Sequence, residues 1–171
     1  MAEQTQVLSQ WHQHFEGLNQ SAQAFYSMVQ KAVETKKIPD VKFSRVEHKE
    51  GGLFSSSREY LRVVRGDLRY EICGAPFGNG FFVSSRLFAD GKLGDSLLGS
   101  MERGGLMANI AGAVTSRVVG ADTYMKADSA IMYLQLVHRG LLEAVDAMTT
   151  SASLPRLPEA ERKPVMKGFF Q

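Results

Sequence analysis

The chain has 171 residues, of which 44% are hydrophobic and 22% are charged, a composition that excludes a disordered chain and predicts one globular core. The 20 Lys and Arg against 18 Asp and Glu give a formal charge of +2, which is too small an excess to indicate nucleic-acid binding. One cysteine, no secretory pattern and uncharged runs too short to span a bilayer favour a cytoplasmic location.

The N-terminal region carries a narrow apolar stripe. From Leu8 to Ala32 the apolar residues recur at alternating steps of three and four, which predicts one long helix within residues 1–37. Such a stripe can pack against a later helix of the same chain, or it can form the seam of a homodimer. The seam residues would be Leu8, Trp11, Phe15, Leu18, Phe25 and Val29.

Residues 41–88 change to runs rich in Val, Phe, Tyr and Ile separated by glycines, which predicts a four-stranded antiparallel meander. Gly66-Asp67 fits a two-residue hairpin turn, and this turn sets the strand register. The register pairs Leu61 with Ile72, Arg62 with Glu71, and Val63 with Tyr70. One face of the sheet is therefore expected to be apolar and the other to carry charges.

The remaining segments complete an α+β fold in a single domain of residues 1–171. Residues 74–80 are expected to form a loop, because they combine a proline with several glycines. Residues 91–121 are glycine-rich and predict a weak helix, whereas residues 122–150 have a broad apolar surface and predict the core helix. The tail, 151–171, is expected to hold a short basic helix. The C-terminal helices would pack on one face of the sheet.

Three residues are candidates for catalysis. Cys73 could act as a thiolate nucleophile if a histidine activates it, but no cysteine-hydrolase signature surrounds it, and a small buried packing residue is the other interpretation. His138 lies among leucines of the core helix, where it is either a hydrogen-bonded core residue or an acid/base partner of Glu71. No second ligand stands four residues after it, so no metal site is predicted, and no cofactor is expected.

A small anionic ligand could bind the charged face of the sheet. Arg62 and Arg69 share that face in the predicted register, and Tyr60 lies beside them as a stacking candidate. The alternative is a solvated face on which acidic neighbours neutralise the arginines. The backbone amides of Gly78, Asn79 and Gly80 could also contact a ligand, although this loop matches no phosphate-binding or dinucleotide-binding motif and is otherwise a structural bend.

One run of sequence resembles a known family. The segment from Tyr70 to Ser84, YEICGAPFGNGFFVS, is similar to an uncharacterised family of bacterial proteins, often membrane-anchored, that carry Ile-Cys-x-Ala-Pro-Phe-Gly-x-Gly-Phe-Phe. Residues 128–132 and 161–164 continue the likeness. In those relatives the stretch between the blocks is strongly hydrophobic, whereas here charged residues interrupt it. The resemblance implies a module on the cytoplasmic side of a membrane and no particular activity.

The sequence thus favours a non-enzymatic binding or regulatory module that self-associates through its helical seam. Its partner would be an unknown protein or a small anionic ligand. One alternative is a small cysteine-dependent enzyme that uses Cys73 with a histidine. Another is a peripheral membrane protein in which residues 93–119 lie in the lipid interface without spanning it.

Overall fold

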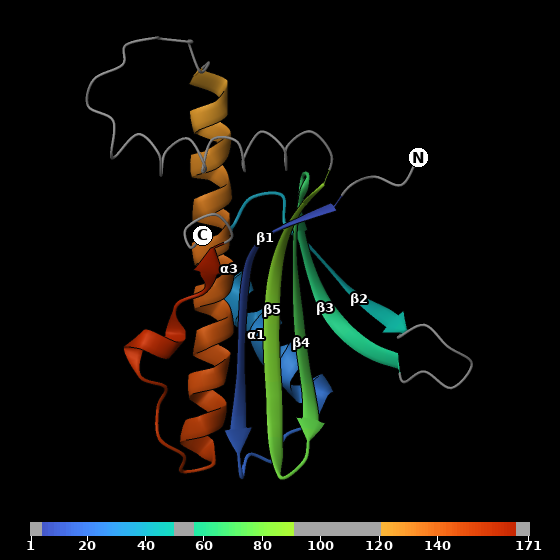
Figure 1. The fold of residues 1–171 in the computed structure, drawn as a ribbon, viewed down its shortest axis with the longest axis vertical. Coiled ribbons are helices and arrows are strands. Elements are labelled where there is room, and N and C mark those ends of the chain that lie inside the picture. Colours follow the sequence, from blue (N-terminus) through green and yellow to red (C-terminus); the bar gives the residue numbers. More distant parts are fainter. Residues whose placement is uncertain (1–4, 50–56, 91–120, 167–171) are drawn as a thin grey trace.

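The computed structural model describes residues 5–49, 57–90 and 121–166, and it shows a curved sheet with its long helices on one side (Figure 1). The expected weak helix at 91–121 lies almost wholly outside these residues, as does the end of the tail. The described elements are β1 (Thr5–Glu16), α1 (Ala22–Glu34), β2 (Lys42–Lys49), β3 (Ser57–Arg65), β4 (Leu68–Phe77), β5 (Gly80–Asp90), α3 (Ala121–Ser151), a 3-10 turn η1 (Glu159–Arg162) and β6 (Val165–Met166).

The predicted long N-terminal helix is wrong. Its first half is β1, and its second half is the separate helix α1. A regular strand would turn Leu8 and Trp11 to opposite faces, but the register of β1 on β5 shifts between Val7 and Ser9, and both side chains are buried. The break after β1 lies at Gly17, which has a positive φ of 74°, and Ser21 caps α1 by accepting a hydrogen bond from the amide of Ala24.

The sheet has six antiparallel strands in the order β2-β3-β4-β5-β1-β6, so the predicted four-stranded sheet is also wrong. One of the two additional strands is β1, which was expected to be helical and pairs with β5, and the other is β6, which pairs with β1. The hairpin register deduced from Gly66-Asp67 is confirmed. Leu61 pairs with Ile72, Arg62 with Glu71, and Val63 with Tyr70.

The segment expected to be a loop, 74–80, is mostly strand. β4 continues through Phe77, and Pro76 pairs with Phe81. A proline is tolerated here because the pairing of β3 with β4 ends at Leu61 and Ile72, so that β4 has a strand partner on only one side beyond that point. Only Gly78 and Asn79 form the turn to β5.

Both long helices cover the same face of the sheet. From α1, the ring of Phe25 packs edge-on against Phe81, with 5.5 Å between ring centroids. From α3, the Tyr133 hydroxyl donates a 2.8 Å hydrogen bond to the carbonyl of Val63. The helices also contact each other at Val33 of α1 and Gly140 of α3, where a Cβ atom on residue 140 would lie 2.7 Å from the Val33 side chain. The core therefore lies between the sheet and these two helices.

The C-terminal tail differs from the basic helix expected there. It forms the short turn η1, and Lys163 then has extended dihedrals because it precedes a proline. The chain continues into β6, which pairs with β1 at Ser9 and Gln10. Among the helices in the described part of the chain, none is long and apolar enough to cross a membrane.

Candidate functional site

The two faces of the sheet carry different side chains. Neighbouring residues of a strand point to opposite faces, so the register assigns each side chain to one face. The face against α1 and α3 is apolar. No described helix lies on the other face, which we call the helix-free face (Figure 1). Its described side chains are Gln10, His12, His14 and Glu16 of β1, Lys42, Ser44, Val46 and His48 of β2, Arg58, Tyr60, Arg62 and Val64 of β3, Arg69, Glu71, Cys73 and Ala75 of β4, and Phe82, Ser84, Arg86 and Phe88 of β5.

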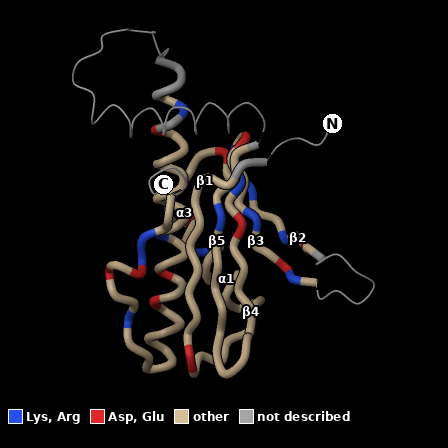
Figure 2. Tube along the Cα trace, viewed as in Figure 1, with Lys and Arg blue, Asp and Glu red and all other residues tan. Residues whose placement is uncertain are grey.

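Positive charge is concentrated on the helix-free face. Figure 2 shows the lysines and arginines of the neighbouring strands. Among the side chains described on this face, the basic ones are Lys42, Arg58, Arg62, Arg69 and Arg86, and the acidic ones are Glu16 and Glu71. The excess of 5 − 2 = +3 exceeds the formal charge of +2 for the whole chain. The described side chains of this face therefore carry a net positive charge.

Glu71 lies at the centre of this charge and is only 7% exposed. Its Oε1 accepts two hydrogen bonds from Arg62, at 2.9 Å from Nε and 2.7 Å from Nη2. Arg69 lies 3.5 Å from the same oxygen, and His48 lies 3.2 Å from Oε2. One carboxylate thus fixes the positions of two arginines but neutralises only one positive charge.

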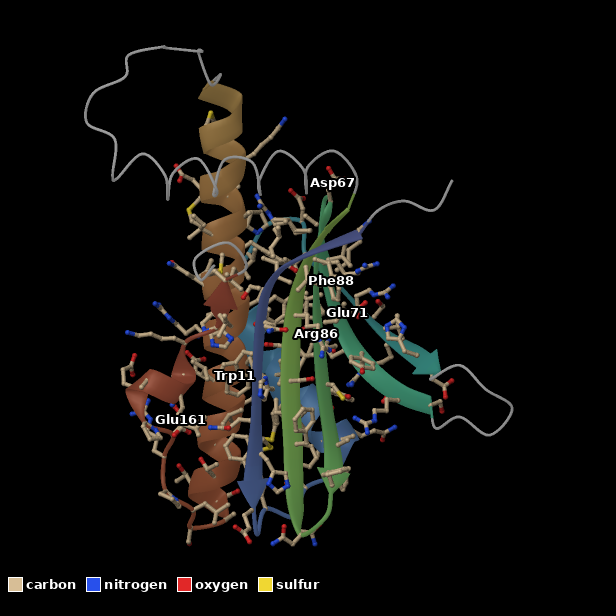
Figure 3. All side chains as sticks on the ribbon, viewed as in Figure 1. Trp11, Asp67, Glu71, Arg86, Phe88 and Glu161 are labelled. Atoms are coloured by element: carbon tan, nitrogen blue, oxygen red, sulfur yellow. The ribbon has the colours of Figure 1, made fainter. Side chains whose placement is uncertain are left out.

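Arg86 stands directly across from Glu71 on β5, and its side chain is exposed. Within the described residues it makes no hydrogen bond or ion pair, so its guanidinium remains available to a ligand. Aromatic rings are interleaved with these cations. Arg69 lies over the ring of Phe88, 5.0 Å from its centroid. Half-buried Phe82 lies farther along β5 on the same face. Figure 3 shows Glu71, Arg86 and Phe88 close together on the sheet.

Cys73 also belongs to the helix-free face, but it is only 1% exposed. Beyond the last pair of β3 and β4, the Tyr26 hydroxyl fills the space between the strands, donating to the carbonyl of Glu59 and accepting from the amide of Gly74 at 3.0 Å. Tyr26 and Tyr60 both border the thiol. Burial raises the pKa of Cys73, and nearby Arg58 only partly opposes the shift. The thiol is therefore protonated at neutral pH, unlike a cysteine nucleophile.

His138 lies on the opposite side of the sheet, in a buried chain of polar groups. Its Nε2 is 2.7 Å from the carbonyl oxygen of Arg162, and its Nδ1 is 3.0 Å from the Tyr70 hydroxyl. Since a carbonyl can only accept, Nε2 carries the proton, and a neutral ring leaves Nδ1 as the acceptor of Tyr70. Ser85 completes the chain at 2.9 Å from Tyr70. Burial lowers the pKa of His138 and favours this neutral form.

The structure does not bring the three catalytic candidates together. Cys73 and Glu71 lie on the helix-free face, whereas His138 contacts Tyr70, which points to the helix side. The sheet therefore separates His138 from the thiol and from the carboxylate. Neither the pairing of Cys73 with His138 nor the pairing of Glu71 with His138 has the contact that acid/base or nucleophilic catalysis requires.

The other predicted positions fall into two groups. Arg62, Arg69 and Tyr60 share the helix-free face, whereas the turn at Gly78 and Asn79 lies at one end of the sheet. There the Asn79 side chain binds Glu16, and Gly80 packs against the backbone of Phe15. The six proposed seam residues are all buried in the core of the chain itself, so they form no helical seam. The predicted homo-oligomer itself stays a prediction.

Sequence reasoning missed the role of Arg86 and of the two phenylalanines. The register of β5 on β4 was not assigned, because residues 74–80 were interpreted as a loop. The signal was present: Phe82, Ser84, Arg86 and Phe88 alternate with buried Phe81, Val83, Ser85 and Leu87. A two-residue turn at Gly78-Asn79 would have placed Arg86 opposite Glu71.

Comparisons with known proteins add little to this geometry. No family model matches the chain, and no curated protein matches it. Among solved structures it is similar to the di-domain ARO/CYC StfQ from the steffimycin biosynthetic pathway, with a TM-score of 0.33 and 10% sequence identity. The match covers 86% of this chain and 52% of that one, so this chain spans about half the length of StfQ. A likeness at this level indicates no shared activity.

Proposed function

We propose that the protein is a non-enzymatic binding module that recognises a phosphate or carboxylate group on its helix-free face. The observation that carries the proposal is the arrangement around Glu71: a buried carboxylate holds Arg62 through two hydrogen bonds, while Arg86 directly across has no described partner. A guanidinium that is already oriented loses less conformational entropy when it binds an anion.

The rings near these arginines favour a ligand that is more than a bare ion. Phe88 and Tyr60 are half-buried, Phe88 beneath Arg69 and Tyr60 between Arg58 and Arg62, and each can offer part of its ring to an apolar or aromatic group. A phosphate linked to such a group would contact both kinds of side chain. Three sources share this chemistry: a phosphorylated small molecule, a single-stranded nucleic acid and an anionic phospholipid.

Binding assays with matched probes test the proposal. We would titrate the protein with pyrophosphate, citrate, oligothymidylate and vesicles containing phosphatidylserine, using calorimetry for the soluble probes and flotation for the vesicles. At least one probe is expected to bind, with an affinity that falls as salt rises. Whichever probe binds most tightly identifies the source of the anionic group.

Variants then locate the site. Arg86→Ala is expected to weaken binding about fivefold to tenfold, because one partly exposed charge-assisted contact contributes about 1 kcal/mol. Lys31→Ala removes the same charge from the exposed surface of α1 and is expected to leave the affinity unchanged. If no probe binds, or if both variants weaken binding equally, recognition on the helix-free face is wrong.

A further inference from the structure

A second surface lies on the other side of the molecule, between α3 and the C-terminal segment 156–166. This segment is fixed to the rest of the fold. Arg162 donates two hydrogen bonds to Asp146, at 2.7 and 2.9 Å, and Arg156 donates a third at 3.0 Å. The indole of Trp11 donates a 2.7 Å hydrogen bond to the carbonyl of Glu161 (Figure 3). These contacts hold the C-terminal segment in a defined position beside α3, where it forms one wall of the surface.

A groove of about 860 Å³ runs between this wall and α3. Its apolar lining is formed by Ile131, Leu134, Leu142, Pro164 and Met166. Ile131 is 40% exposed although it is a large apolar residue, so part of this lining faces solvent. The volume lies within the range of about 300–1,000 Å³ that small-molecule sites occupy in proteins.

The charges along the groove are unequally satisfied. Asp146 is bound by Arg162 and Arg156, Glu143 is bound by Lys36 from α1, and exposed Glu159 lies 3.9 Å from Arg162. Arg139 and Lys163 also line the groove, and neither has a hydrogen bond or ion pair within the described part of the chain. Each of the three acidic groups thus lies beside a cation of the protein, whereas Arg139 and Lys163 have no described partner.

We infer that this groove binds a small molecule with an apolar body and one acidic group, such as a medium-chain carboxylate. The apolar body lies along Leu134, Leu142 and Met166, and the carboxylate is held by Arg139 and Lys163. An apolar lining beside uncompensated cations is complementary to an amphipathic anion and disfavours an amphipathic cation. The inference does not depend on the proposed function, because the groove uses none of the side chains of the helix-free face.

The single tryptophan offers a direct test. Trp11 packs edge-on against His138, with 5.5 Å between ring centroids, and His138 lines the groove. We would titrate the full chain with decanoate, decanol and decyltrimethylammonium below their aggregation concentrations, following Trp11 emission and confirming binding by calorimetry. Decanoate is expected to bind saturably, and to bind at least about tenfold more tightly than the cationic probe.

The variants separate the groove from a general affinity for apolar chains. Arg139→Ala with Lys163→Ala is expected to weaken decanoate binding about tenfold and to leave decanol binding unchanged, because both side chains are exposed and the fold does not depend on them. Lys31→Ala is the charge control. The inference is overturned if decanoate fails to bind, if all three probes bind alike, or if the double variant binds decanoate as tightly as the native chain.

Discussion

Replacing Tyr70 by phenylalanine tests the buried chain that links the sheet to α3. The substitution removes one hydroxyl and leaves the ring and its packing in place. That hydroxyl donates to Nδ1 of His138 and accepts from Ser85, and both partners are 5% exposed or less. His138 cannot compensate by changing tautomer, because its Nε2 proton is needed by the carbonyl of Arg162.

The expected cost follows from the groups left without a partner. A buried polar group that loses its only hydrogen bond costs about 1–3 kcal/mol, and two groups are affected, so Tyr70→Phe should lower the free energy of unfolding by about 2–6 kcal/mol. Urea denaturation followed by the emission of Trp11 measures the difference, since Trp11 packs on His138. The midpoint should fall without a change in the slope of the unfolding free energy against urea.

Ser85→Ala provides the matched comparison. This substitution removes only the Ser85 hydroxyl, while Tyr70 keeps its hydrogen bond to His138. The expected decrease in the free energy of unfolding is therefore below about 1 kcal/mol. The assigned donors and acceptors of these hydrogen bonds would be refuted if Tyr70→Phe lowered the free energy of unfolding by less than about 0.5 kcal/mol, or by less than Ser85→Ala does.

Three further predictions concern burial. Folding lowers the pKa of His138 below its ordinary value of 6.5, so the stability contributed by the neutral ring is complete above pH 6.5 and is lost as the pH falls below it. The urea concentration at the unfolding midpoint should therefore be lower at about pH 5 than at about pH 8. The decrease should be smaller in His138→Asn. Gly74→Ala should destabilise the fold by about 1–3 kcal/mol, because an added Cβ would meet the ring of Phe25 at 2.2 Å; thermal unfolding measures this. Cys73 should react with a disulfide reagent far more slowly in the native chain than in urea, and equal rates would contradict its burial.

The parts of the fold that the sequence predicts well are those with strong local signals. Gly66-Asp67 fixes a hairpin, and the register counted from it holds for every pair that we derived between Leu61 and Leu68. The broad apolar surface at 122–150 likewise corresponds to α3. In both places local turn chemistry and apolar periodicity agree with the tertiary structure.

The N-terminal error shows how two periods can be confused. Trp11 and Phe15 are four apart, which satisfies a helix but also places both on one face of a strand. Leu8 does not fit the alternation of a strand, because it lies three residues before Trp11 and would face the other side. The register shift between Val7 and Ser9 is what allows both residues to be buried in β1. A bulge depends on the partner strand, so the sequence of β1 alone could not reveal it.

Only part of the helix-free face could be predicted, because some of its residues come together through strand pairings that the sequence did not reveal. Arg62 and Arg69 follow from one hairpin, but Arg86 joins them only through the register of β5, which Pro76 obscured. The separation of Cys73 from His138 could not be deduced either, because it depends on which face α3 covers. The pairing of Cys73 with His138 is thus prevented by tertiary geometry and not by residue type.

The ionisable groups on the two sides of the sheet differ in how far the protein itself satisfies them. On the helix side, His138 is hydrogen-bonded to Tyr70 and to the carbonyl of Arg162. Asp146 is bound by Arg162, whose hydrogen bonds lower the pKa of the Asp146 carboxyl. Buried, fully hydrogen-bonded polar groups of this kind rigidify a fold. The uncompensated charges of Arg86, Arg139 and Lys163 lie instead at exposed positions on opposite sides of the sheet. Cations at such positions can hold an anionic group, which is the basis of both binding proposals.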